Sequence, residues 1–268
     1  MKRILLFIIV AFHIVFPKED FLFRNYSINE GLSQSTVISI VQDNRGYLWF
    51  GTQYGLNRFD GYQFQSYYYN TSDSNSICSN NINFLLSDRT GELWIGTDKG
   101  LNYYNSKKNT FIRYQVRSDS KIDNPQNIKT IFDKSNAELL IGTSDGLFLF
   151  SKRNKSFKRI NIESVIRQAR IKINSIHLIK GNYWIATDKG ILKLSLDLVK
   201  AKLIQIKKDV KDIIEVSSLL LYKDKILAGC FPGIYEIDIE TEKIFKLSKD
   251  FPNAQELHVR ELIKDSLN

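Results

Sequence analysis

Three aspartates recur at one turn per repeat of this sequence and are its most regular candidates for chemistry. Asp98, Asp145 and Asp188 each follow a Gly-Thr or Ala-Thr pair and stand one or two residues before a glycine. Recurring carboxylates could serve glycoside hydrolysis, which needs a pair of carboxyl groups facing the substrate. In a tight turn, however, aspartate commonly hydrogen-bonds its own backbone. We therefore interpret these residues first as turn residues, second as ligand contacts, and not as catalytic groups.

No other constellation in the sequence indicates catalysis. The Asp-x-x-Gly-x-Leu-Trp segments superficially resemble sialidase Asp boxes, but Asp88 directly follows Ser87, one place earlier than that motif requires. His177 and His258 do not stand in a nucleophile motif. The sequence has no CxxC pair, no histidine cluster and no EF-hand loop. We expect a protein that is not an enzyme and that needs no metal and no cofactor.

The candidate turns belong to a sequence repeat, whose fullest copy runs from Asp43 to Phe59 and contains Leu-Trp-Phe-Gly-Thr. The residues aligned with Gly51 follow at steps of 45, 46, 44 and 43 and are Gly96, Gly142, Ala186 and Gly229. A period in the forties with strand-like content is typical of propeller blades. The sequence therefore predicts an all-β fold, a β-propeller of four-stranded blades.

The first copy predicts four strands, at 37–42, 47–52, 56–59 and 63–67, separated by turns that contain glycine. The second strand is apolar at consecutive positions, as expected for a blade that is packed on both faces. Trp49, Trp94 and Trp184 hold one equivalent position in this strand, so we expect them in the core between blades. Further inner strands are predicted at 82–87, 128–133, 173–179 and 217–222, and a sixth at 257–265.

The chain thus predicts five complete blades plus the start of a sixth, all within one domain at 19–268. Five blades and one strand do not close a ring, and open sheets leave unpaired edges. We expect the propeller to be incomplete at its C-terminus, as a fragment, a truncated product or the front part of a longer receptor.

The first 18 residues resemble a signal peptide, with Lys2 and Arg3 before an apolar run from Ile4 to Phe16. The run is too short to span a bilayer, so we expect export to the periplasm, with an uncleaved N-terminal anchor as the alternative. Residues 152–211 hold sixteen Lys and Arg against four Asp and Glu. Such a stripe could attract nucleic acid, acidic glycans or a membrane surface. We interpret it as a solvated flank, and in the absence of a nucleic-acid motif we expect no nucleic-acid partner.

The repeat resembles the two-component regulator propeller repeat, in its aspartate-glycine turn, its Leu-Trp-Ile-Gly-Thr strand and its Gly-Leu third strand. The leader Asn29–Val37 also resembles the segment that opens the first blade in that family. The resemblance implies a seven-bladed ring in the periplasmic sensor region of a hybrid two-component system, whose histidine kinase and membrane span would lie downstream. It further implies an oligosaccharide as the sensed ligand. The alternative is a protein-interaction scaffold that assembles through open blade edges with the remaining blades or with another chain.

A ligand is expected at one mouth of the ring, because the loop before each inner strand and the turn after each Gly-Thr pair lie at the same end of a blade. Amides, a tyrosine and mixed charges would suit a polar sugar. If the mouth is merely solvated, a partner would dock on the edge or flank instead. The predicted rim residues are Gln34, Gln53, Tyr54, Asn81, Asp98, Lys99, Asn127, Ser144, Asp145, Asn174, Asp188 and Lys189.

Overall fold

The computed structural model describes residues 24–116, 127–162, 165, 170–207, 213–247 and 258–264. In these ranges the chain forms twenty β-strands and one short 3-10 helix, Ile28–Glu30. The strands make five antiparallel sheets of four strands each, every one built from four consecutive strands. The predicted signal peptide or anchor at 1–18 lies outside the described residues. None of the helices in the described ranges is long and apolar enough to cross a membrane.

The five sheets are the predicted blades, and their strands have the following bounds. The first contains β1 (Val37–Gln42), β2 (Leu48–Thr52), β3 (Gly55–Phe59) and β4 (Phe64–Tyr67). The second contains β5 (Ile82–Ser87), β6 (Leu93–Thr97), β7 (Gly100–Asn105) and β8 (Thr110–Tyr114). The third contains β9 (Ile128–Ser135), β10 (Glu138–Thr143), β11 (Gly146–Ser151) and β12 (Ser156–Arg159). The fourth contains β13 (Ile173–Ile179), β14 (Asn182–Thr187), β15 (Gly190–Ser195) and β16 (Ala201–Ile204). The fifth contains β17 (Val216–Tyr222), β18 (Lys225–Cys230), β19 (Gly233–Asp238) and β20 (Ile244–Lys246).

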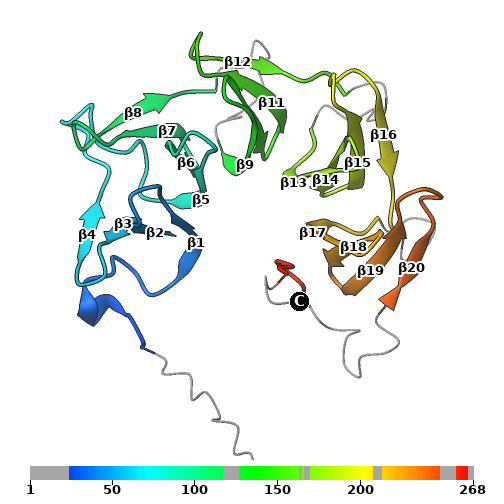
Figure 1. The fold of residues 1–268 in the computed structure, drawn as a ribbon, viewed down its shortest axis with the longest axis horizontal. Coiled ribbons are helices and arrows are strands. Elements are labelled where there is room, and N and C mark those ends of the chain that lie inside the picture. Colours follow the sequence, from blue (N-terminus) through cyan, green and yellow to red (C-terminus); the bar gives the residue numbers. More distant parts are fainter. Residues whose placement is uncertain are drawn as a thin grey trace, which may run out of the picture.

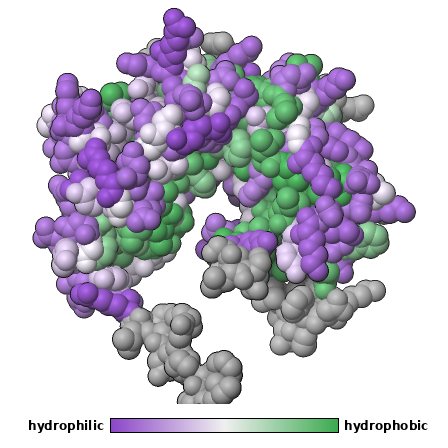
Figure 2. All heavy atoms as spheres, in the orientation of Figure 1, coloured by the Kyte–Doolittle hydropathy of each residue, from purple (hydrophilic) through white to green (hydrophobic). Residues whose placement is uncertain are grey.

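The blades follow one another around a central axis, with the first strand of each blade innermost and the fourth outermost (Figure 1). Each inner strand lies beside the inner strand of the next blade. The first and fifth blades stand on either side of the open part of the arc (Figure 1). Polar residues cover the outer parts of the blades, and apolar residues gather toward the middle (Figure 2). The five predicted blades are confirmed, whereas a total of seven stays a prediction.

The core lies between neighbouring blades, because the second strand of a blade is buried on both faces. β6 is buried at every residue, and the indoles of Trp49, Trp94 and Trp184 are exposed by 3% or less. The predicted place of the tryptophans is therefore confirmed. Burying an aromatic ring of this size is a large part of what holds two blades together.

The repeated glycine allows close packing of one blade on the next. A Cβ added at Gly51 would stand 2.6 Å from Cγ2 of Ile82, the residue that opens the next inner strand. The same contact measures 2.6 Å between Gly96 and Ile128, and 2.5 Å between Gly142 and Ile173. These distances are shorter than carbon atoms tolerate, so a side chain at the glycine would push the blades apart.

Residues 258–264 form no strand, although the sequence predicts a sixth inner strand at 257–265. Val259 nevertheless holds the position that opens such a strand, because its Cγ1 stands 2.7 Å from a Cβ added at Gly229. Its amide also donates to the carbonyl of Cys230 at 3.1 Å. A strand needs a series of backbone hydrogen bonds with its neighbour. This one bond, the one described between residues 258–264 and blade five, does not make such a series. The prediction was right about the packing position and wrong about the strand.

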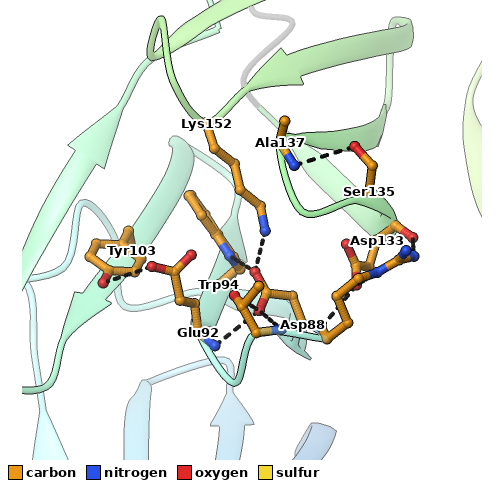
Figure 3. A network of polar contacts seen from close by, with 10 residues as sticks. Asp88, Glu92, Trp94, Tyr103, Asp133, Ser135, Ala137 and Lys152 are labelled. Atoms are coloured by element: carbon orange, nitrogen blue, oxygen red, sulfur yellow. Dashed lines mark hydrogen bonds and ion pairs between the residues drawn. The ribbon is translucent and has the colours of Figure 1, made fainter.

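In the turn between β5 and β6, a buried carboxylate joins blade two to blade three. Asp88 accepts a hydrogen bond from Nε1 of Trp94 at 2.8 Å, and Lys152 of the third blade forms an ion pair with it (Figure 3). The two charged side chains are exposed by 0% and 10%. Burial raises the pKa of Asp88, but the hydrogen bonds from Lys152, Thr90 and Trp94 outweigh it and leave that pKa lowered.

Blade four lacks this carboxylate because its first turn is shorter. Ile179 pairs with Asn182 across the two-residue turn Lys180-Gly181, where both residues have positive φ. Such a turn suits the twist of a hairpin and leaves no room for the longer aspartate turn. Consequently Nε1 of Trp184 is buried without a hydrogen-bond partner among the described residues.

Candidate functional site

The predicted rim loops do meet at one end of every blade, which we call the mouth. In each blade the residue that opens the inner strand pairs with the residue that closes the second strand. The five pairs are Val37 with Thr52, Ile82 with Thr97, Ile128 with Thr143, Ile173 with Thr187 and Val216 with Cys230. The loop before the inner strand and the turn after the second strand therefore leave the sheet side by side.

A threonine holds the mouth turn of the first four blades. Its Oγ1 donates to the carbonyl of the glycine three residues later and accepts from the amide two residues later. These threonines are Thr52, Thr97, Thr143 and Thr187, and their amide donors are Tyr54, Lys99, Asp145 and Lys189 at 3.0 to 3.1 Å. The interpretation that the recurring aspartates hydrogen-bond their own turns was wrong, because the threonine hydroxyl already satisfies the turn.

The three aspartates have separate surroundings instead. Oδ1 of Asp188 accepts from the amide of Lys172 at 2.9 Å and so ties the two mouth loops of blade four. Asp145 forms an ion pair with Arg159 at 3.3 Å. Oδ1 of Asp98 is buried without a hydrogen-bond partner in the described part of the chain. Because the three carboxylates differ in their partners, they do not form one repeated ligand site.

Several other predicted rim residues tie the mouth loops together. Gln34 accepts from the amide of Gln53 at 3.1 Å, and the carbonyl of Asn127 accepts from the amide of Ser144 at 3.0 Å. The amide of Asn81 bonds within its own loop, to Ser79. These contacts use backbone groups and the side chains of Gln34 and Ser79, so they stabilise the loops and do not themselves create a ligand site.

Two of the predicted residues face outward beside aromatic rings. The ring of Tyr54 is 60% exposed and meets Tyr68 edge to face, with 6.1 Å between centroids. The ammonium of Lys99 lies 5.7 Å from the ring centroid of Tyr69, which the guanidinium of Arg113 also faces. This outer part of the mouth therefore presents tyrosines and cations to solvent.

A β-bulge recurs in each inner strand at the mouth. Between the first and third residues of the strand the register shifts, so that the second residue has no partner on the neighbouring strand. A bulge of this kind re-aims a side chain and is frequent beside functional sites. The five bulge residues are Ile38, Asn83, Lys129, Asn174 and Ser217. Of these the sequence analysis named only Asn174, although all follow the first apolar residue of the inner strand.

Two bulge asparagines connect their blade to the next one. Nδ2 of Asn83 donates to Oδ1 of Asn127 at 3.0 Å and to the carbonyl of Ile128 at 2.9 Å. Nδ2 of Asn174 donates to Glu215 at 3.0 Å and to the carbonyl of Val216 at 2.7 Å. Their amide nitrogens are thereby engaged across the blade boundary, and a ligand that contacts them would sense the spacing of two blades.

Charged residues line the mouth between blades two and five. Burial lowers the pKa of the half-buried Lys129, nearby Lys172 lowers it further, and Asp98 opposes this. Lys172 forms an ion pair with Glu215 at 2.7 Å. Burial raises the pKa of Glu215, but the hydrogen bonds of Lys172 and Asn174 outweigh it and leave that pKa lowered. The carboxylate is thus held in its charged form at the mouth.

A small pocket adjoins this carboxylate. It encloses about 290 Å³ and is lined by Glu215, Ser217, Phe231 and His258. The ring of Phe231 is 59% exposed and meets the imidazole of His258 edge to face, at 5.6 Å between centroids. The volume is near the lower limit of ligand pockets, which is roughly 300 Å³. One aromatic face, one hydroxyl and one fixed carboxylate converge there.

The repeat and the fold define the class of protein. Residues 31–54 and 76–99 match the family model of the two component regulator propeller. Over 74 residues the chain is 45% identical to histidine kinase P4 of Formosa agariphila, a match that covers 28% of this chain and 5% of that protein. The resemblance found in the sequence is confirmed: the chain carries two-component regulator propeller repeats.

Solved structures agree with this assignment. The extracellular domain of the putative hybrid two component system BT3049 from B. thetaiotaomicron is 27% identical, with a TM-score of 0.68 over 83% of this chain and 31% of that one. The corresponding domain of BT4673 has 18% identity and a TM-score of 0.58 over 86% of this chain and 38% of that chain, and shares the fold. The chain spans less than a third of either P4 or the BT3049 domain. Its blades are of the kind found in the extracellular domains of two-component systems.

Proposed function

We propose that the chain is the ligand-sensing propeller of a two-component regulator, that it lies in the periplasm, and that it binds an oligosaccharide without chemical conversion. The propeller domain spans 19–268 and follows a signal peptide or anchor at 1–18. Its relatives support the location, because BT3049 and BT4673 are described by their extracellular domains. A histidine kinase would read the signal, as in other two-component systems.

The recurrent bulge is the observation that carries the sugar proposal. It brings polar side chains of successive blades, among them Asn83, Asn174 and Ser217, to the same mouth. The exposed ring of Phe231 and the charged Glu215 stand beside them. Sugars are bound by such sets, in which amides and carboxylates hydrogen-bond the hydroxyls and an aromatic ring stacks on the sugar face.

Signalling would follow from binding across a blade boundary. Asn174 and Glu215 belong to consecutive blades and already share a hydrogen bond. A ligand that contacts both, together with His258 of the following segment, would favour the arrangement of blades that it fits. A ligand shifts a conformational equilibrium only by the difference between its affinities for the two states. The hydrogen bonds of Asn174 to Glu215 and to the carbonyl of Val216 support this proposal, because they cross from one blade to the next.

Isothermal titration calorimetry of the purified chain against a panel of plant and algal oligosaccharides tests the proposal. We expect one of them to bind, and Phe231→Leu to weaken binding by about tenfold, since an aromatic contact contributes roughly 0.5–1.5 kcal/mol beyond its buried area. Tyr62→Leu is the matched control, because Tyr62 is 93% exposed on a turn between outer strands. Equal affinity of the Phe231 variant and the wild type would place the sugar elsewhere.

A second candidate function is assembly through an open blade face, with the remaining blades or another chain as partner. β1 exposes Ile40 by 59%, whereas the equivalent residues of the later inner strands are buried, namely Leu85, Ile131, Ile176 and Leu219. Light scattering after size exclusion distinguishes the two. If the wild type is a dimer and Ile40→Lys is a monomer, assembly through β1 is supported. If the wild type and Ile40→Lys are both monomers, assembly through β1 is contradicted and the sensor proposal remains.

A further inference from the structure

Lys129 differs from the other bulge residues of the mouth. It is the bulge residue of β9 in blade three, is half-buried, and lies close enough to Asp98 and Lys172 for their charges to act on it, but its ammonium has no hydrogen bond and no ion pair with any described residue. Asn83 and Asn174 hold the same position in the blades on either side and are engaged with the next blade. The third blade therefore places an unpaired cation where its neighbours place bonded amides.

The surrounding charges do not neutralise this lysine. Lys172 is paired with Glu215, and Lys189 with Asp188 at 3.5 Å. Asp98 is near enough to act on Lys129 through space but forms no ion pair with it. A partly buried charge without a partner is costly, because it has lost water and gained nothing in return. A bound anion would remove that cost.

We propose that the mouth is an anion site centred on Lys129, and that the ligand is an acidic oligosaccharide whose carboxylate or sulfate ester contacts this ammonium. This rests on the ligand-sensing function proposed for the same mouth and narrows its ligand class. Lys172 adds positive potential from the adjacent blade, and Asp98 competes with the ligand for Lys129. An ammonium and an oxyanion share a hydrogen bond and also attract each other as opposite charges. A neutral sugar can accept from Lys129 but gains less.

Two substitutions, Lys129→Gln and Asp98→Asn, should change the affinity for anions in opposite directions, which makes the test specific. Lys129→Gln removes the charge and keeps an N–H donor on a slightly shorter side chain, so the preference for an acidic sugar over a neutral one should be lost. Asp98→Asn removes the competing carboxylate, so anion binding should become tighter. Lys129→Arg keeps the charge and should retain binding, which separates loss of charge from loss of folding. Lys158→Gln is the matched control, because Lys158 is an exposed lysine on β12 of the same blade.

The probes are trigalacturonate, a galactotriose that carries sulfate esters, neutral galactotriose and inorganic sulfate, each titrated calorimetrically into the full chain at low and high salt. We expect an acidic trisaccharide to bind at least about tenfold tighter than the neutral one at low salt, as one charge-assisted hydrogen bond allows. Lys129→Gln should bring both to the same affinity, and high salt should narrow the difference. The two acidic probes distinguish a carboxylate from a sulfate ester.

The outcomes separate this inference from the proposed function. Equal binding of acidic and neutral sugars, with loss in Phe231→Leu, would overturn the anion site and leave the sugar sensor standing. Sulfate binding that needs Lys129, without binding of any sugar, would support the anion site and contradict the glycan proposal. Failure of sulfate and of both acidic sugars to bind in a Lys129-dependent manner would overturn the inference.

Discussion

Replacing Trp94 or Trp184 by phenylalanine probes how the blade turns are stabilised. The two indoles hold the same position in their blades and are 3% and 0% exposed. Nε1 of Trp94 donates to Asp88 at 2.8 Å, whereas Nε1 of Trp184 is buried without an acceptor among the described residues. Each ring also has an ammonium over it, Lys152 at 5.6 Å and Lys193 at 4.9 Å. The pair thus differs mainly in one hydrogen bond.

The free energies follow from that difference. Loss of a hydrogen bond to a charged acceptor costs about 1.5–3 kcal/mol, and removal of a buried unsatisfied donor returns roughly 1–3 kcal/mol. The loss of ring volume is common to both variants and cancels in the comparison. We therefore expect Trp94→Phe to destabilise the protein by at least about 2 kcal/mol more than Trp184→Phe.

Urea unfolding followed by far-ultraviolet circular dichroism measures this, because that signal arises mainly from the backbone and less from the tryptophans being replaced. The midpoints are comparable only if both variants keep the slope of the wild type. Trp49→Phe is an independent repeat, since Trp49 donates to Asp43 at 2.8 Å, and it should resemble Trp94→Phe. Equal losses in Trp94→Phe and Trp184→Phe would refute the role of the aspartate turn.

Three further predictions concern the same blade contacts. Lys152→Met should destabilise the protein by about 3–5 kcal/mol, because it leaves the fully buried Asp88 without its cation. Since the folded-state pKa of Asp88 is lowered, its contribution to stability is present above the ordinary carboxylate pKa and is lost as pH falls through the lowered value. The wild type should therefore lose more stability than Asp88→Asn between neutral and strongly acidic pH. Gly96→Ala should cost about 1–3 kcal/mol, because its Cβ would stand 2.6 Å from Ile128.

Matched variants test each of these in the same unfolding assay. Lys180→Met removes the cation of an exposed ion pair, whose lysine and aspartate side chains are 46% and 85% accessible, and should cost no more than about 1 kcal/mol. A similar loss in Lys152→Met would show that burial of the pair is unimportant. Parallel pH profiles of Asp88→Asn and the wild type would contradict the pKa argument. Ala186→Gly, the reverse change at the equivalent position of blade four, should not show the steric cost of Gly96→Ala.

The blades could be predicted from sequence because their signals are local. The strand predicted at 47–52 is observed at Leu48–Thr52, and those predicted at 56–59 and 63–67 at Gly55–Phe59 and Phe64–Tyr67. Turns with glycine and short apolar runs specify such strands within a few residues of chain. The sixth inner strand was predicted from the same signals, but in the described segment Val259 makes one backbone hydrogen bond to blade five, and no strand forms. A strand depends on its neighbours as well as on its own residues.

The mouth was predicted in outline and not in detail. Its position follows from the order of strands, which the repeat already implies. The bulge residues Asn83, Lys129 and Ser217 were missed because a bulge is a register shift between two strands, and register is set by pairing and packing. The role of the aspartates was misassigned because the sequence does not tell which of two neighbouring polar groups, the threonine or the aspartate, reaches the turn amide.

The sequence by itself determined the repeat, the all-β class, the five blades and the buried tryptophans, since each is encoded in the pattern of a single copy. Only the tertiary structure decided which polar residues are satisfied and which are left over. Asn83 finds its partners, Asn127 and Ile128, about one repeat away on the next blade, whereas Lys129 finds none among the described residues. Such pairing depends on how closely two neighbouring blades approach each other. The residue pattern within one copy of the repeat does not specify the distance between two copies.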